Sequence, residues 1–120
     1  MYDGELILKP MPDGESWWVQ QPFYFLLDLK YEKIKPGFIT DFASIPKAFQ
    51  WFEQPATGKH RAAAVCHDWL YSEHPCSRKE ADDTFLTLML HDGYNKYKAY
   101  ILYAIVRLFG GSHWGKNGVE

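Results

Sequence analysis

"HRAAAVCHDWLYSEHPCSRKEADDTFLTLMLHDG", residues 60–93, determines how the second half of this chain folds. Its first part, segment 60–74, places apolar residues at the spacing of one helical face, at positions 62, 65, 66, 69 and 70. Pro75 cannot continue a helix and therefore ends this segment. The pattern predicts an amphipathic helix over 60–74.

A second helix is predicted directly after this break. Ser77 followed by Glu80 is the capping-box pattern that opens a helix. The predicted helix covers 78–91, its apolar residues at 81, 85, 88 and 89 form one stripe, and Gly93 fits a C-terminal cap. Because only residues 75–77 separate the two helices, we expect them to be antiparallel neighbours.

The N-terminal half has a different pattern. Segment 5–29 is rich in aromatic and other strand-favouring residues and carries turn residues at Asp13 and Gly14, which predicts strands joined by turns. Segment 35–52, "KPGFITDFASIPKAFQWF", contains two prolines and a glycine around a short apolar core. It is expected to form a turn, a brief strand and then a short helix that starts near Pro46.

The C-terminal segments complete the predicted domain. A third helix is predicted over 96–109, "KYKAYILYAIVRLF", and the tail 111–120 is expected to be irregular. At 120 residues and 14.0 kDa the chain has room for one core, so we expect a single domain, 1–120, with a β-rich part over 1–58 and a helical part over 59–110. The fold class is predicted to be α+β: an N-terminal antiparallel β hairpin or small sheet, followed by three helices.

Composition narrows the classes of function. A formal charge of −2, with no run of basic residues, argues against a protein that binds nucleic acid through electrostatic attraction. The N-terminus lacks a signal-peptide pattern and no segment has the length of a membrane span, so export and membrane anchoring are not expected. Cys66 and Cys76 are expected to be reduced thiols.

The two central helices should bring reactive side chains together. His67 and Tyr71 are four residues apart and share a helical face, whereas Asp68 points about 100° away from His67. An antiparallel second helix can place Asp82 or Asp83 opposite His67. A carboxylate that accepts a hydrogen bond from one imidazole nitrogen leaves the other nitrogen as a base, which predicts a His–Asp dyad. Asp68 is a candidate ligand for a hard cation.

These motifs resemble a known enzyme family. "HDWLY" followed by "ADDTF" is similar to the paired-helix core of the phospholipases A2, above all their compact prokaryotic and parvoviral forms. The resemblance implies an ester hydrolase in which His67 is the general base that activates a water molecule. It further implies that Asp82 orients His67 and that Tyr71 supports Asp82 through a hydrogen bond.

The same resemblance implies a cofactor and a substrate. Calcium would be bound by Asp68, and groups near Asp41 would complete the cation site. The bound cation would stabilise the oxyanion of the reaction. The substrate would be membrane phospholipid, so a phospholipid or membrane surface is the expected partner.

A wider pattern resembles a second family. From Gly37 to Trp114, "GFITDFASIP…AAVCHDWLY…SRKEADDTF…VRLFG…W" is similar to a family of small proteins encoded by phages and prophages. This resemblance implies a location in the virion or in the host cytoplasm, with other phage structural proteins as partners. It also supports a non-catalytic alternative, in which a tail or capsid component, or an accessory factor that binds a host protein, keeps the helical pair as a scaffold.

Simpler interpretations of single residues stay open. His67 and Asp82 would also fit a buried polar pair that locks two helices together. Asp83 is expected at the surface near a helix N-terminus, and Cys66 is expected to be a small core residue rather than a nucleophile. His60 before the His-Asp pair invites comparison with metal-dependent phosphohydrolases, but those folds are larger and entirely helical.

Two further groups have two interpretations each. Asp41, Ser44 and Pro46 of "DFASIP" fit a turn whose side chains bond the backbone, or alternatively the lining of a cleft beside His67. Four aromatic residues would either insert into lipid as a ring or pack inside the protein: Trp17, Trp18, Trp51 and Phe52.

Overall fold

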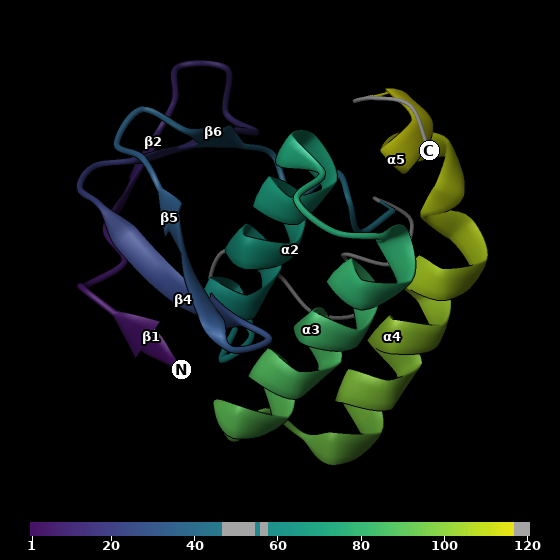
Figure 1. Cartoon of the computed structure of the whole chain (residues 1–120). Helices are drawn as coiled ribbons and strands as arrows, with labels where there is room; N and C mark the ends of the chain where they lie inside the picture. Colours follow the sequence, from purple (N-terminus) through teal and green to yellow (C-terminus); the bar gives the residue numbers. More distant parts are fainter. Residues whose placement is uncertain (47–54, 56–57, 117–120) are drawn as a thin grey trace. The chain divides into compact units, whose positions relative to one another are not determined.

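The α+β class is confirmed by a computed structural model that describes residues 1–46, 55 and 58–116 (Figure 1). The chain divides into two compact units, Met1–Asp41 and Phe42–Glu120. Segment 42–46, which we expected in the β-rich part, therefore belongs with the helices.

The N-terminal unit contains two antiparallel sheets of three strands each. One sheet has the strand order β1-β4-β5, formed by Tyr2–Asp3, Phe23–Leu27 and Lys30–Ile34. The other has the order β2-β3-β6, formed by Leu8–Pro10, Trp17–Val19 and Ile39–Thr40.

Local turn chemistry explains this arrangement. The Asp13 carboxylate accepts hydrogen bonds from the backbone N–H groups of Glu15 and Ser16, which closes the predicted turn between β2 and β3. Asp28 takes a left-handed conformation, with φ of 57°, and thereby lets β4 turn tightly into β5. Strand β5 was not predicted, because the three charged residues of "KYEKI" leave no run of strand-favouring residues.

The helical unit follows the predicted ranges closely. Its described helices are α2 (Arg61–Glu73), α3 (Arg78–His91), α4 (Lys96–Phe109) and α5 (Gly111–Lys116). α3 packs against both α2 and α4. The short helix expected near Pro46 falls in 47–54, outside the described residues.

The expectation of an irregular tail was wrong for residues 111–116, which form α5. Trp114 explains the extra helix, because its indole is only 3% exposed and stacks on the His74 ring at 3.7 Å. It also meets the Tyr71 ring edge to face at 5.1 Å. The burial of one large aromatic side chain holds this otherwise polar, glycine-containing segment on the other helices.

Capping residues fix where the central helices begin and end. The capping box is present in full: the Ser77 hydroxyl accepts the Glu80 backbone N–H, and the Glu80 carboxylate accepts the Ser77 backbone N–H. His74 ends α2 in a left-handed conformation directly before Pro75. Gly93, with φ of 77°, follows the end of α3 as predicted.

The apolar stripe predicted for α3 is confirmed, since Ala81, Phe85, Leu88 and Met89 are all fully buried. On α2 the buried face is wider than the pattern indicated and extends over most of Ala63–Tyr71. Within the described part of the chain, no helix is long and apolar enough to cross a membrane.

The capping box provides a test of the fold. Ser77→Ala removes the side-chain acceptor at the start of α3 and should cost about 1 kcal/mol of unfolding free energy, or roughly 4 °C in Tm. Differential scanning calorimetry measures both. Ser72→Ala, at a helical serine without a capping role, is the matched control and should change Tm by less than about 1 °C. Equal effects of the two substitutions would contradict the capping role of Ser77.

Candidate active site

The predicted His–Asp dyad forms between α2 and α3. His67 Nε2 lies 2.7 Å from Asp82 Oδ1, and neither side chain has any exposed surface. The imidazole is held between two aromatic rings, with centroid distances of 4.4 Å to Tyr71 and 4.5 Å to Phe85. These contacts hold the plane of the His67 ring, and the hydrogen bond to Asp82 directs its Nε2.

Asp82 of α3 accepts hydrogen bonds from two other helices, α2 and α4, and we call Asp82 with His67, Tyr71 and Arg107 the Asp82 network. The Tyr71 hydroxyl donates to Oδ1 at 2.7 Å, and Arg107 Nη1 of α4 donates to Oδ2 at 2.8 Å. Burial alone would raise the pKa of Asp82, but the hydrogen bonds from His67, Tyr71 and Arg107 outweigh it and hold the pKa below its ordinary value. The carboxylate is therefore ionised although it is buried.

Tyr71 acts as a donor in this network. Burial, together with the hydrogen bond to Asp82 and its negative charge, raises the pKa of the Tyr71 phenol far above its ordinary value. The phenol therefore keeps its proton at neutral pH. The hydrogen bond by which Tyr71 was expected to support Asp82 is thus present, with Tyr71 as the donor.

The other imidazole nitrogen faces a serine hydroxyl. Ser44 Oγ lies 2.9 Å from His67 Nδ1, and the Ser44 side chain is 1% exposed. An ionised carboxylate only accepts hydrogen bonds, so in the neutral imidazole Nε2 must carry the proton that it donates to Asp82. Nδ1 is then an acceptor, and the Ser44 hydroxyl donates to it. This directed chain, Ser44 to His67 to Asp82, has the connectivity of nucleophile, base and orienting acid.

Ser44 is held in place by Asp68. The Ser44 backbone N–H donates to Asp68 Oδ1 at 3.1 Å, and Asp68 is 7% exposed. The Ile45 N–H closes the same turn on the carbonyl oxygen of Phe42. Phe42 has φ of 59°, a strained value for a bulky residue. Such strain persists only where the surroundings over-determine it, and it occurs often at functional sites.

Asp68, the predicted calcium ligand, lies beside Ser44 and His113. Its Oδ1 already accepts the Ser44 N–H and lies 4.0 Å from His113 Nε2. Among the described residues, no three His, Cys, Asp or Glu side chains gather closely enough to hold a metal ion. Asp41, the second residue expected at the cation site, belongs to the other unit and its side chain is exposed. A joint site with Asp68 stays a prediction, and no reaction step is assigned to calcium.

Other residues considered from the sequence have local roles. Asp83 pairs with Lys79 at 2.7 Å and accepts a hydrogen bond from Tyr103, and its side chain is 44% exposed. Burial raises the pKa of the Cys66 thiol well above its ordinary value, so this thiol stays protonated and is a poor nucleophile. Neither Cys66 nor Cys76 forms a disulfide bond. The His60 ring packs on the Tyr94 ring, with centroids 4.5 Å apart.

Sequence reasoning missed the two arginines beside Asp82. Arg107 had a signal, because it is the one charge in the apolar second half of α4, and such a residue usually has a buried acidic partner. Arg78 Nη1 lies 3.6 Å from Asp82 Oδ2. The same guanidinium donates to the carbonyl oxygens of Val106 and Arg107 and so satisfies the C-terminal end of α4. Nothing in the spacing of Arg78 indicated this second contact.

The ionisation of Asp82 gives a pH-dependent prediction. Its pKa is lower in the folded than in the unfolded state, so Asp82 stabilises the fold above the unfolded value near 4, and this contribution is lost as the pH falls through the folded value. Asp82→Asn should lower the unfolding free energy by about 3–5 kcal/mol at pH 7. The difference from wild type should shrink below about pH 4.

Urea unfolding of both proteins from pH 7 to pH 3 measures this difference. Asp83→Asn is the matched control, because the neighbouring carboxylate is partly exposed and should cost less than about 1 kcal/mol. A difference between wild type and Asp82→Asn that stays constant over this pH range would contradict an ionised Asp82.

Comparison with known proteins identifies the family. The family described as "Protein of unknown function (DUF1353)" matches residues 17–106, a span that contains Ser44, His67, Tyr71 and Asp82. The chain is also 40% identical over 77 residues to the uncharacterized protein y4iH of Sinorhizobium fredii. That alignment covers 63% of this chain but 32% of the relative, which is thus a much longer protein. No solved structure matched the chain. On the extent of the family match, the chain belongs to the DUF1353 family.

Proposed function

We propose that this protein is an ester hydrolase whose reacting groups are Ser44, His67 and Asp82. The observation that carries the proposal is the directed hydrogen-bond chain from the Ser44 hydroxyl through both nitrogens of His67 to the Asp82 carboxylate. A nucleophile, a base and an orienting acid within hydrogen-bond reach of one another are the parts that acyl transfer requires.

The proposed reaction follows from the proton positions. As Ser44 Oγ attacks an ester carbonyl, its proton moves to His67 Nδ1, and the imidazolium that forms is stabilised by Asp82. His67 then gives the proton to the departing alkoxide, which leaves an acyl group on Ser44. A water molecule, deprotonated by His67 in the same way, releases the acid and restores the Ser44 hydroxyl. Tyr71 and Arg107 are positioning residues that keep Asp82 ionised.

The substrate class and the biological setting rest on the two sequence resemblances. The phospholipase A2 resemblance favours membrane phospholipid as the ester, and the phage resemblance favours a role during infection, in the virion or in the host cytoplasm. In the phospholipase version of the mechanism, His67 activates a water molecule directly. Ser44 is the group at Nδ1 in this structure, which favours a reaction through the serine hydroxyl.

A second candidate function is non-catalytic, and the burial of the site favours it. Ser44 is 1% exposed, and His67 and Asp82 have no exposed surface. A buried network that joins three helices and a turn is what a scaffold needs to hold a fixed geometry. In this version the chain is a tail or capsid component, or an accessory factor that binds a host protein.

Covalent labelling separates the two candidates. A fluorophosphonate probe reacts with an activated serine by losing fluoride and forming a bond to the serine oxygen. We expect labelling of wild type at Ser44 and none in Ser44→Ala. Ser112→Ala, at an exposed serine, is the matched control and should label like wild type. No labelling of folded wild type would refute the serine mechanism.

Hydrolysis assays test the activity itself. Ser44→Ala should lower the hydrolysis of p-nitrophenyl butyrate and of phosphatidylglycerol vesicles by about 10³-fold or more. Circular dichroism of each variant checks that the fold is intact. Assays with calcium and with EDTA test the predicted calcium requirement. Fatty-acid release that survives Ser44→Ala but not His67→Asn would favour the water mechanism, whereas no release by wild type would favour the scaffold.

A further inference from the structure

The proposed reacting groups are closed off from solvent. Ser44 is 1% exposed, and His67 and Asp82 have no exposed surface. An ester cannot reach Ser44 Oγ in this state, so hydrolysis requires an element beside the site to move away and let the substrate enter. Helix α5 is suited to this movement, because it lies next to the site and is held there by a single buried side chain.

Helix α5 lies against the part of α2 that supports Ser44. Its His113 Nε2 lies 4.0 Å from Asp68 Oδ1, and the same carboxylate oxygen accepts the Ser44 backbone N–H at 3.1 Å. The two nitrogens are therefore no further apart than the sum of these distances. The His113 ring also lies over the Tyr71 ring, with centroids 6.1 Å apart. α5 thus covers Asp68, which holds Ser44, and Tyr71, which supports Asp82.

One side chain holds α5 in this position. Of residues 111–115, Trp114 alone is buried. Its indole lies parallel to the His74 ring and meets the Tyr71 ring edge to face. In the described part of the chain, the buried atoms Trp114 Nε1 and His74 Nε2 have no hydrogen-bond partner. Their missing hydrogen bonds offset part of the gain from burying the indole, and both atoms regain water when α5 moves away.

The join between α4 and α5 is the second feature that suits movement. Gly110 caps α4 and Gly111 opens α5. Glycine destabilises a helix relative to alanine, because its backbone loses more conformational freedom. A Cβ at Gly110 would lie 2.6 Å from the Tyr71 hydroxyl, so the docked state of α5 requires glycine there. Two consecutive glycines therefore form a hinge between a long helix and a short one.

The side of α2 beneath α5 becomes a groove once α5 has moved. Asp68, Tyr71 and His74 follow one another at intervals of three residues and so share one side of the helix. They extend over about 9 Å, from the residue that holds Ser44 toward the end of α2. The rings of Tyr71 and His74 suit contact with an apolar chain. In the closed structure Trp114 packs on both of these rings.

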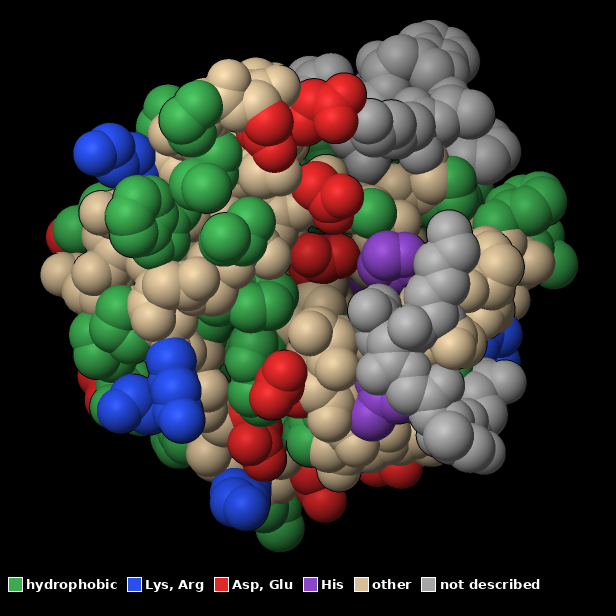
Figure 2. All heavy atoms as spheres, turned by 90° about the horizontal axis from the view of Figure 1, so that it is seen from above, with side chains coloured by type: hydrophobic (Ala, Val, Ile, Leu, Met, Phe, Trp, Pro, Cys, Tyr) green, Lys and Arg blue, Asp and Glu red, His purple; other side chains and the backbone are tan. Residues whose placement is uncertain are grey.

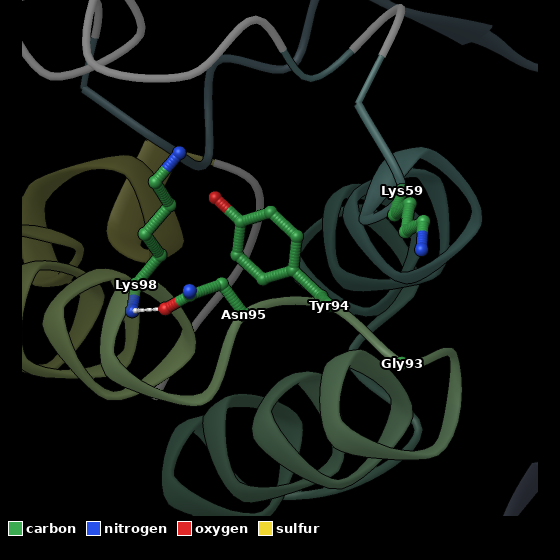
Figure 3. Close-up of a pocket in the computed structure, with 5 residues that line it drawn as sticks. All are labelled: Lys59, Gly93, Tyr94, Asn95 and Lys98. Atoms are coloured by element: carbon green, nitrogen blue, oxygen red, sulfur yellow. Dashed lines mark hydrogen bonds between the residues drawn. The ribbon is translucent and has the colours of Figure 1, made fainter.

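A pocket at the other end of α4 is distinct from this groove. It has a volume of about 390 Å³, and its described lining consists of Lys59, Gly93, Tyr94, Asn95 and Lys98. Figure 3 shows the Tyr94 ring between the two lysines. The pocket adjoins the N-terminal end of α4, whereas α5 follows the C-terminal end, about 21 Å away along the helix axis. Its described lining contains none of the reacting groups.

The aromatic residues considered from the sequence for contact with lipid differ from Trp114. Trp18 is 40% exposed and Trp17 is partly buried. Trp51 and Phe52 lie outside the described residues. Apolar side chains reach the surface elsewhere too, as Figure 2 shows for one face of the molecule, and such exposure is ordinary. Trp114, in contrast, is buried against the Asp82 network.

We propose that α5 is a lid, and that the side of α2 beneath it, from Asp68 to His74, binds the acyl chain of the ester. The proposal rests on the hydrolase function above and names the acyl-binding part of the same site. The lid turns about Gly110 and Gly111 and withdraws Trp114, so that the chain lies on the exposed rings and the ester carbonyl reaches Ser44. In the closed state Trp114 competes with the acyl chain.

The rate of fluorophosphonate labelling at Ser44 measures how often the lid is open. Trp114→Ala removes the anchor of α5 and should raise this rate about tenfold or more. Trp18→Ala, at a partly exposed tryptophan of the other unit, is the matched control and should be labelled at the wild-type rate. Circular dichroism checks the fold of both variants. Equal labelling rates of wild type and folded Trp114→Ala would overturn the lid.

A hinge variant keeps the test decisive if Trp114→Ala does not fold. Gly111→Ala meets no described atom closer than 3.9 Å in the closed state, so it fits there and stiffens the hinge. It should slow labelling about threefold. Gly115→Ala adds the same methyl group within α5 but away from the hinge, and should leave the rate unchanged. The same rate for both variants would contradict a hinge at Gly110 and Gly111.

Hydrogen–deuterium exchange tests the lid and the groove without hydrolysis. The amides of 111–116 should exchange faster than those of α3, because the lid opens without unfolding of the other helices. Decanoate, a fatty acid that fits the groove, should displace Trp114 and raise deuterium uptake in 111–116 about twofold or more, while α3 stays protected. Acetate, which lacks the chain, is the matched control and should have no effect.

The exchange results separate failure of the lid from failure of the hydrolase. Exchange of α5 only together with α3 would overturn the lid, and uptake that decanoate leaves unchanged would overturn the acyl groove. Absence of labelling at Ser44 in every variant would refute the hydrolase, while faster exchange of 111–116 with decanoate would still support the lid and its groove.

Discussion

The buried carboxylate of Asp82 is the constraint on which the helical unit depends. An ionised group without exposed surface is very costly unless donors surround it, and here the donors come from α2, in His67 and Tyr71, and from α4, in Arg107. Removing one partner leaves the other charges buried without compensation. The relative positions of these three helices are therefore fixed by electrostatics as well as by apolar packing.

The same constraint gives the candidate site its chemistry. The ionised Asp82 can only accept hydrogen bonds, so the neutral His67 carries its proton on Nε2. His67 Nδ1 is then an acceptor, and the Ser44 hydroxyl donates to it. Asp68 completes the arrangement by holding the backbone of Ser44, in a turn that contains the strained Phe42. A network built for stability alone would also need a donor for the buried Nδ1 of His67. The strained Phe42 in the turn that presents Ser44 is the feature that favours a reacting centre over a scaffold.

Local signals in the sequence predicted much of this structure. The capping box at Ser77, the break at Pro75 and the helical spacing of apolar residues are short-range features, and they placed three helices and brought His67 to Asp82. Contacts distant in the chain were predicted less well. A place for Ser44 beside His67 was one of two alternatives, and the pairing of Arg107 with Asp82 was not predicted, because these partners are 23 and 25 residues apart and no periodic pattern links them.

Helix α5, and the division of α4 into a buried and an exposed face, also depend on contacts that the local sequence does not indicate. The segment 111–116 is helical because Trp114 packs on His74 and Tyr71, a contact that glycine-rich local sequence does not indicate. Helical spacing also cannot show which apolar face of α4 is buried, since both faces are apolar. Only the packing of α3 against one side reveals that the Tyr97–Leu108 side is exposed.

The direction of the hydrogen bonds at His67 is most directly measured by long-range proton–nitrogen correlation NMR of the imidazole. Under conditions where His67 is neutral, we predict a proton on Nε2, slow to exchange and shifted downfield by Asp82, and a bare Nδ1 that accepts from Ser44. Ser44→Ala should change the Nδ1 shift and leave the Nε2 proton in place. A neutral His67 with its proton on Nδ1 would contradict the directed chain, because Ser44 would then accept a hydrogen bond and could not be activated.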